Sequence, residues 1–118
     1  MKILLIQPSK GSLTISGEDL RCMHEPLALE YIASGIVKNH QIRILDMRIE
    51  KDLESVLRDF RPDVVGITAY TVHVNTAKRL FQEIKAWNPG VFTVVGGHHA
   101  TISPEDFLTP SVDVIVTG

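Results

Sequence analysis

The chain has 118 residues, of which 44% are hydrophobic and 22% are charged, which is the ordinary balance of one soluble globular domain. Its 12 basic and 14 acidic residues leave a net charge of −2, without the Lys/Arg stripe that nucleic-acid binding requires. The apolar runs are far shorter than the ~20 residues of a membrane helix, and no signal peptide is recognisable. We therefore expect one cytoplasmic domain, residues 1–118, that binds neither nucleic acid nor membrane.

Five apolar runs rich in valine and isoleucine recur along the chain and predict β-strands. They lie at residues 2–6, 42–45, 63–67, 91–95 and 112–116. Near-continuous apolar strands are typical of a parallel sheet that crossover helices cover on both faces. The pattern predicts an α/β, flavodoxin-like, doubly wound fold: a five-stranded parallel sheet of order 2-1-3-4-5 with helices on both faces.

Four helices are predicted between the strands, over residues 26–39, 53–60 and 74–87 and from 103 onward. In the first, the side chains expected to face the sheet are Leu27, Tyr31, Ile32 and Ile36. The second should end before Pro62, because proline disfavours helical geometry in Arg61. The fourth should have Ser103 as its N-cap and Pro104 at its first position.

Ligands of doubly wound sheets bind outside the carboxyl ends of the strands. The loops at 7–25, 68–73, 96–103 and from 117 onward should therefore form one rim. The first of these has ~18 residues, whereas such loops usually have ~2–6. It offers possible hydrogen-bond donors to an anion at Ser9, Gly11, Ser12, Thr14, Ser16 and Gly17. A solvated loop is the alternative interpretation.

The third and fourth strands end in residues suited to ligand contact. Thr68 brings a hydroxyl to the point where the strand order reverses, although threonine at a strand end also satisfies local backbone groups. Gly96 and Gly97 would let a ligand or another backbone approach closely.

The histidines and the cysteine do not form a metal-binding pattern. His98 and His99 are adjacent, so on an extended segment they would point to opposite sides, and the sequence has no HxxxH or CxxC. Three others are interpreted as ordinary surface or loop histidines: His24, His40 and His73. Cys22 is expected to be a small, partly buried side chain. No residue is assigned as catalytic or as a metal ligand, because no nucleophile elbow, Walker loop or carboxylate cluster is present.

Four segments together carry a family resemblance: Lys2-Ile3-Leu4-Leu5-Ile6-Gln7-Pro8, Pro26-Leu27-Ala28-Leu29, Arg61-Pro62-Asp63-Val64-Val65-Gly66-Ile67-Thr68 and Val94-Val95-Gly96-Gly97-His98-His99-Ala100-Thr101. In order and spacing they resemble the N-terminal cobalamin (vitamin B12)-binding domain of radical S-adenosylmethionine enzymes, of the magnesium-protoporphyrin monomethyl ester oxidative cyclase and cobalamin-dependent methylase types. Cobalamin domains carry Asp-x-His-x-x-Gly, Ser-x-Leu and Gly-Gly after strands one, three and four. Gly96 and Gly97 match the third motif, Thr68 and Tyr70 approximate the second, and the first is missing.

The resemblance implies a cobalamin-binding module whose cofactor is held base-off, with no histidine as lower ligand. The cofactor-binding residues it implies are Gln7, Pro8, Ser9, Thr68, Ala69, Tyr70, Gly96, Gly97, His98 and Thr117. It also implies a domain excised from a longer protein, with a C-terminal radical S-adenosylmethionine domain in cis that holds a 4Fe–4S cluster and S-adenosylmethionine. On this interpretation the domain itself carries no catalytic centre, and the parent protein is a methyltransferase or a cyclase.

Two alternatives stay open. The first is a flavodoxin-like electron carrier that binds flavin mononucleotide through residues 9–17, although a flavodoxin phosphate loop runs directly into its helix and several residues intervene here. The second is an interaction domain without a cofactor. A visible absorption spectrum after reconstitution distinguishes a corrin from a flavin, and either from no chromophore.

Overall fold

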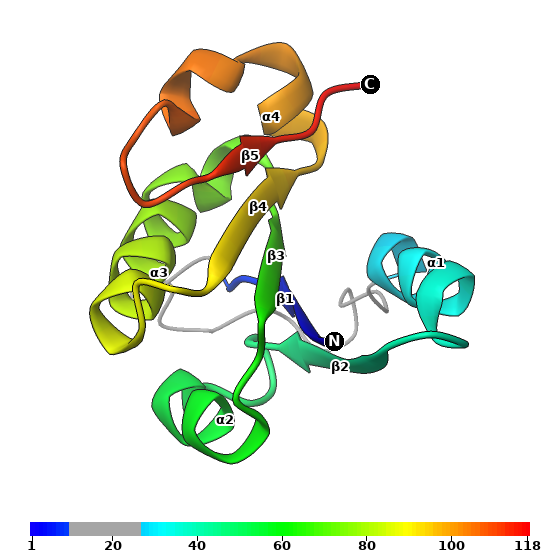
Figure 1. Ribbon diagram of the computed structural model, residues 1–118. Coiled ribbons are helices and arrows are strands. Elements are labelled where there is room, and N and C mark those ends of the chain that lie inside the picture. Colours follow the sequence, from blue (N-terminus) through cyan, green and yellow to red (C-terminus); the bar gives the residue numbers. More distant parts are fainter. Residues whose placement is uncertain (10–26) are drawn as a thin grey trace.

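A computed structural model describes residues 1–9 and 27–118. Five parallel strands form one sheet (Figure 1) with the predicted order β2-β1-β3-β4-β5. Their bounds are Lys2–Gln7 (β1), Gln41–Asp46 (β2), Val64–Thr68 (β3), Phe92–Gly96 (β4) and Val114–Ile115 (β5). The last strand is shorter than predicted, and it pairs with β4 only at Val94 and Val95.

The helices are α1 (Leu27–Ile36), α2 (Leu53–Phe60), α3 (Val74–Trp87) and α4 (His98–Ile102), with 3₁₀ turns η2 (Thr71–His73) and η3 (Pro104–Phe107). The predictions of α2 and α3 are confirmed. The end of α2 has the predicted cause: Arg61, before proline, takes a left-handed φ of 52° that stops the helix. None of the helices in the described part is long and apolar enough to cross a membrane.

The fourth helix differs from the prediction. A helix begins already at His98, directly after β4, and Pro104 begins only a single 3₁₀ turn. The cause is Gly97, whose φ of 99° turns the chain abruptly from strand to helix. His98 and His99 therefore lie on a helix and not on an extended segment, although consecutive helical residues also point in different directions.

The face that the first helix buries overlaps the predicted one only in part: Ile36 is partly buried and Ile32 lines the cleft, but Tyr31 is exposed and Leu29 is buried in its place. Leu29 is 4% exposed, whereas Tyr31 is 82% exposed and Ile32 is half exposed. The helix has 10 residues and ends at Ile36, before the predicted end near residue 39. Pro26 and the side chain of Leu27 lie outside the described residues.

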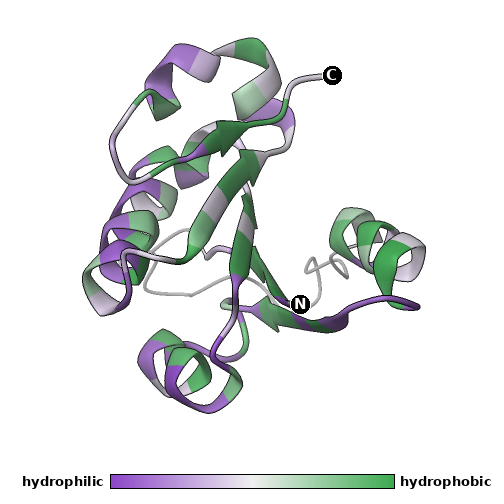
Figure 2. Cartoon of the chain, viewed as in Figure 1, coloured by the Kyte–Doolittle hydropathy of each residue, from purple (hydrophilic) through white to green (hydrophobic). Residues whose placement is uncertain are grey.

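The main core lies on one face of the sheet, under α2 and α3. It joins strand residues with helix residues in one cluster: Leu4, Ile6, Leu45, Val65, Ile67 and Val95 from the strands and Val56, Leu57, Leu80, Phe81 and Ile84 from the helices. Figure 2 shows the central strands β1, β3 and β4 as mostly hydrophobic, whereas β2 also carries hydrophilic residues. On the opposite face α1 lies against β1 and β2 (Figure 1).

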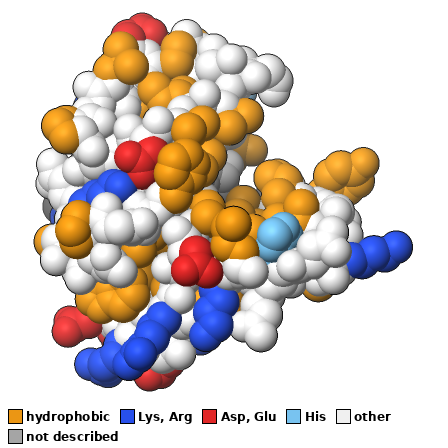
Figure 3. Space-filling model, in the orientation of Figure 1, with side chains coloured by type: hydrophobic (Ala, Val, Ile, Leu, Met, Phe, Trp, Pro, Cys, Tyr) orange, Lys and Arg blue, Asp and Glu red, His pale blue; other side chains and the backbone are white. Residues whose placement is uncertain are grey.

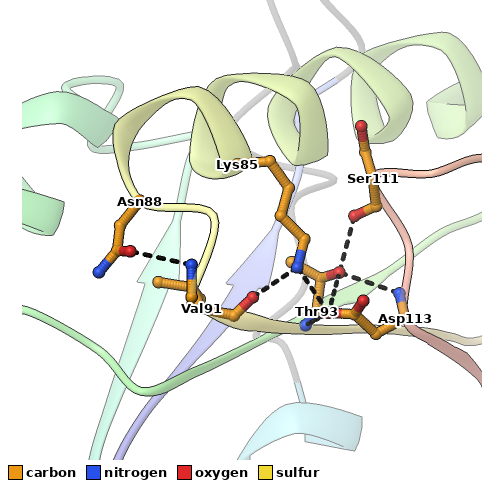
Figure 4. A network of polar contacts seen from close by, with 7 residues as sticks. Lys85, Asn88, Val91, Thr93, Ser111 and Asp113 are labelled. Carbon is orange, nitrogen blue, oxygen red and sulfur yellow. Dashed lines mark hydrogen bonds and ion pairs between the residues drawn. The ribbon is translucent and has the colours of Figure 1, made fainter.

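A polar network fixes the short strand β5 to β4 and α3 (Figure 4). Lys85 Nζ donates to Asp113 Oδ2 at 2.7 Å and to the carbonyl oxygen of Val91 at 2.7 Å. The backbone N–H of Thr93 donates to the same carboxylate at 2.9 Å, and its hydroxyl donates to the carbonyl of Ser111 at 2.7 Å. The hydrogen bond from Lys85, followed by that from the Thr93 backbone, lowers the pKa of Asp113 from its ordinary value. The network therefore fixes the beginnings of β4 and β5, at the edge of the sheet opposite the ligand rim.

Candidate functional site

A cleft with a volume of about 590 Å³ opens between α1 and the carboxyl ends of β3, β4 and β5. Its lining is mainly apolar and comprises Ala28, Leu29, Ile32, Gly66, Ile67, Thr68, Val94, Gly96, Gly97, His98, Thr101, Val116 and Gly118. Figure 3 shows hydrophobic side chains gathered across the middle of the molecule, from the strands to α1. The cleft lies on the rim where the strand order predicted a ligand.

The floor of the cleft is shaped by two strand glycines. A Cβ built on Gly66 would lie 3.1 Å from Leu5 Cδ2, and one built on Gly96 would meet only Val116 Cβ, at 3.8 Å. Both positions line the cleft. A side chain at Gly96 would therefore fit without a clash and would take up space that the cleft now offers to a ligand.

Gly97 has a different role from its neighbour. A Cβ on it would lie 2.6 Å from Thr68 Oγ1 and 2.9 Å from the backbone nitrogen of Ala69. The two loops meet at this point: Ala69 N–H donates to the carbonyl of Gly96 at 3.0 Å, and His99 N–H donates to the carbonyl of Ala69 at 2.9 Å. The sequence left open whether this glycine lets a ligand or another backbone approach closely. In the structure, Gly97 lets the backbone of Ala69 approach.

His99 joins three segments of the rim. Its Nε2 lies 2.6 Å from Asp106 Oδ2 in η3, and its Nδ1 lies 3.0 Å from Thr71 Oγ1 in η2. Both ring nitrogens are therefore engaged, one with a carboxylate oxygen and the other with a hydroxyl. His99 is 8% exposed. His99 therefore fixes the loop after β3 to the segment after β4.

Tyr70 forms an exposed aromatic group on the rim. Its ring lies 5.9 Å from that of His98 and 6.0 Å from that of His73. His73 is buried, and its Nδ1 accepts a hydrogen bond from the backbone N–H of Tyr70 at 3.3 Å. His73 was interpreted as a surface or loop histidine: it does lie in the segment between β3 and α3, but it is buried there and supports the turn that presents Tyr70.

The predicted cofactor residues are distributed unevenly about the cleft. Those that line it are Thr68, Gly96, Gly97 and His98. Gln7, Pro8 and Ala69 are buried, Ser9 is partly buried, and Thr117 is exposed between two lining residues. The interpretations of Cys22, His24 and the donors between Gly11 and Gly17 lie outside the described residues.

Several lining residues were missed from the sequence, and part of the signal was present. Side chains along a strand alternate between its two faces. Because Thr68 was predicted to contact the ligand, Gly66 could have been placed on the same face, and in the same way Gly96 indicates Val94. The contribution of Leu29 from α1 depends on the face that the helix presents, of which the sequence predicted Ile32 but not Leu29.

The cleft is electrostatically neutral. The described residues that line it include no Asp, Glu, Lys or Arg, and its polar side chains are Thr68, His98 and Thr101. Thr101 Oγ1 donates to the carbonyl of Gly97 at 3.0 Å. At the end of β2, outside the lining, hydrogen bonds from Arg48 lower the pKa of Asp46. The cleft is suited to a bulky, largely apolar group with a few hydrogen-bonding atoms.

Curated relatives cover the whole chain but are much longer than it. An uncharacterised methyltransferase of Pyrococcus horikoshii is 35% identical and covers 100% of this chain, which spans 27% of that protein. The cytidylyl-2-hydroxyethylphosphonate methyltransferase of Streptomyces wedmorensis is 30% identical and covers 99% of this chain, which spans 26% of it. The anaerobic magnesium-protoporphyrin IX monomethyl ester cyclase of Rubrivivax gelatinosus is 28% identical and covers 100% of this chain, which spans 22% of it.

A solved structure and a family model agree with the fold. A cobalamin-binding protein from Desulfitobacterium hafniense superimposes with a TM-score of 0.69 at 14% identity, over 99% of this chain and 52% of the other. At that identity the likeness concerns the fold. The model of the B12 binding domain matches residues 17–118, most of the chain. The chain therefore belongs to the B12-binding domain family, as its sequence motifs indicated.

Proposed function

We propose that this domain binds the nucleotide arm of cobalamin in the cleft between α1 and the sheet, as a module of a radical S-adenosylmethionine enzyme. The observation that carries the proposal is the neutral floor, kept free of side chains at Gly66 and Gly96. A volume of about 590 Å³ fits an arm of such a cofactor and not the whole of it. The corrin ring would remain at the rim, near Tyr70 and His98.

The residues of the cleft fit that arm chemically. An aromatic base requires apolar walls, which Leu29, Val94 and Val116 supply. The sugar and amide groups require a few hydrogen-bond partners, and the Thr68 hydroxyl lies at the end of β3 for this purpose. When bound, the cofactor supplies a cobalt that carries a methyl group or an electron, and this chain positions it.

The catalytic machinery would lie elsewhere in a longer polypeptide. The chain spans between 20% and 27% of the four curated relatives, which are named methyltransferases or cyclases. Together with the sequence resemblance, this supports a parent methyltransferase or cyclase. Its radical S-adenosylmethionine domain, in cis, would hold a 4Fe–4S cluster and S-adenosylmethionine.

A flavin mononucleotide carrier is less well supported. A flavin phosphate is an anion, and no Lys or Arg is found among the described residues that line the cleft. The loop proposed for that phosphate, residues 9–17, lies almost entirely outside the described residues.

Reconstitution with a matched pair of variants tests the proposal. Hydroxocobalamin is titrated into the protein, retained cofactor is measured by visible absorption after gel filtration, and flavin mononucleotide is titrated in parallel. Gly96→Val should weaken cobalamin binding by tenfold or more, because the side chain fills the cleft. Gly35→Val is the control, since a Cβ there has no neighbour within 4 Å and the position does not line the cleft. Equal affinities of the two variants, or retention of flavin alone, would contradict the proposal.

The proposal includes a base-off cofactor without a histidine below the cobalt. Around His24 the positions of the family Asp and Gly hold Cys22 and Leu27, so a ligand histidine would lack its usual supporting carboxylate. Electron paramagnetic resonance of the cobalt(II) form should show no nitrogen superhyperfine splitting. Splitting that disappears in His24→Ala or His98→Ala would identify a histidine ligand. Splitting that persists in both would indicate the cofactor's own base.

A further inference from the structure

Several hydrogen-bonding atoms around the cleft are already engaged within the protein. The backbone of the floor lies in the paired strands β3 and β4, whose N–H and C=O groups bond between strands. The hydroxyl of Thr101 donates to the carbonyl of Gly97 at 3.0 Å and accepts from the N–H of Gly118 at 3.3 Å. These groups are therefore not available to a ligand that enters the cleft.

Two lining side chains, Thr68 and His98, make no hydrogen bond within the part of the chain that the structure describes. His98 is exposed, and its ring lies beside that of Tyr70 at the rim. Thr68 is partly buried at the carboxyl end of β3. Its hydroxyl is thus the side-chain group that a ligand inside the cleft can reach.

The other side chains that such a ligand meets are aliphatic. Leu29 comes from α1, Val94 from β4 and Val116 from the segment after β5. None of them donates or accepts a hydrogen bond. The cleft thus combines apolar walls with one available hydroxyl.

Cobamides, the class of cofactor to which cobalamin belongs, share a corrin ring and differ in the base at the end of the nucleotide arm. The dimethylbenzimidazole of cobalamin has one free ring nitrogen, which accepts one hydrogen bond, and is otherwise hydrocarbon. An adenine base has two further ring nitrogens and an exocyclic amine. Each polar group that is buried without a partner lowers the affinity of a ligand.

We infer that the cleft selects cobamides with a benzimidazole base over cobamides with a purine base. The Thr68 hydroxyl can satisfy the single free nitrogen of a benzimidazole, and the aliphatic walls suit the rest of that base. An adenine in the same place would leave its amine and ring nitrogens against Leu29, Val94 and Val116 without partners. The inference rests on the proposed function, because it assumes that the nucleotide arm occupies this cleft.

Titration with two cobamides tests the inference. Cobalamin and the cobamide with an adenine base are titrated into the cofactor-free protein, and binding is followed by visible absorption. The wild type should bind cobalamin at least about tenfold more tightly, because the purine leaves several polar groups unpaired. Adenine is the weaker ligand of cobalt, so the displacement of the base from the metal works against this preference and does not produce it.

Adding a hydroxyl to a wall should reduce the preference. Val94→Thr keeps the shape of the side chain, offers the purine a partner and should lower the ratio of affinities by about threefold or more. Val116→Thr places a hydroxyl on a second wall and should act in the same direction. Val114→Thr is the matched control, since Val114 is exposed on β5 and does not line the cleft, and its ratio should equal that of the wild type.

The outcomes separate this inference from the proposed function. Equal affinities of the wild type for the two cobamides would overturn the inference alone. A preference for cobalamin that is unchanged in both Val94→Thr and Val116→Thr would also overturn it, because the base would then be distinguished outside these walls. Failure of both cobamides to bind would contradict the proposed function, and this inference with it.

Discussion

Replacing Gly97 with alanine tests how the two ligand loops are joined. Gly97 has a φ of 99° and a ψ of −170°, a region that is essentially restricted to glycine. The added Cβ would also lie 2.6 Å from Thr68 Oγ1 and 2.9 Å from Ala69 N. The Thr68 hydroxyl belongs to a side chain, but the Ala69 nitrogen is a backbone atom whose N–H donates a hydrogen bond to the carbonyl of Gly96. The backbone at Ala69 therefore has little freedom to move away from the new Cβ.

Both effects destabilise the folded state. Strain in a sparsely populated backbone region costs about 1–3 kcal/mol, and overpacking costs typically about 1–3 kcal/mol. We expect the unfolding free energy of Gly97→Ala to fall by about 2–5 kcal/mol, a large part of the roughly 5–15 kcal/mol of a small domain.

Urea denaturation followed by circular dichroism measures this loss as a lower midpoint at an unchanged m-value. Gly96→Ala is the control, because its Cβ meets only Val116 at 3.8 Å, and its midpoint should stay near that of the wild type. Combining Gly97→Ala with Thr68→Ala removes one of the two close contacts and should restore part of the stability. A Gly97→Ala protein within about 0.5 kcal/mol of the wild type would refute the assignment of Gly97 to backbone packing.

Three further predictions concern single contacts. Asp113→Asn should lower the unfolding free energy at pH 7 by about 1–2 kcal/mol and flatten its acid dependence. The lowered pKa of Asp113 gives stability that is present at neutral pH and is lost as pH falls below about 4, so urea titrations at pH 7 and 3.5 measure both effects. His99→Phe, which removes the hydrogen bonds of a buried histidine to Thr71 and to the half-exposed Asp106, should cost about 0.5–1.5 kcal/mol in thermal unfolding, and Asp106→Asn should cost less. Leu29→Ala should cost about 2–4 kcal/mol, whereas Tyr31→Ser should stay within about 0.5 kcal/mol, both by urea titration.

Each of these has a contradicting result. An acid profile of Asp113→Asn identical to that of the wild type would show that this carboxylate does not contribute to acid unfolding. Equal losses in His99→Phe and Asp106→Asn would mean that the hydrogen bond between His99 and Asp106 accounts for both, and that the contact of His99 with Thr71 adds no stability. A Tyr31→Ser protein as unstable as Leu29→Ala would restore the helix face predicted from the sequence.

The sheet could be predicted because its signals are local and strong. Runs of valine and isoleucine mark each strand, and Pro62 marks the end of α2 through its effect on Arg61. The right-handed crossover then leaves few strand orders, and the observed one is the usual solution. The loops at the carboxyl edge follow from that order, which is why Thr68, Gly96 and His98 were found to line one cleft.

The remaining features depend on contacts distant in sequence. The face that α1 buries is set by where the helix sits against β1 and β2, so Tyr31 and Leu29 cannot be told apart by spacing alone. The start of α4 depends on the φ of Gly97, which is set by its packing on Ala69. The burial of His73 depends on a backbone donor that only the turn after β3 presents.

The two glycines after β4 show how one motif serves both folding and binding. Gly97 lets the loops of β3 and β4 meet, and that contact, reinforced by His99, fixes where β4 ends. At Gly96, one residue earlier, a Cβ would meet only Val116, so the absence of a side chain there leaves its space to the cleft. Because a Cβ on Gly97 would meet Thr68 and Ala69 whereas one on Gly96 would meet only Val116, a Gly-Gly pair at the end of a parallel strand can join two loops at one residue and keep a ligand floor open at the other. Substitutions at the two positions should therefore separate the two roles: loss of stability at Gly97, and loss of cofactor affinity in a stable protein at Gly96.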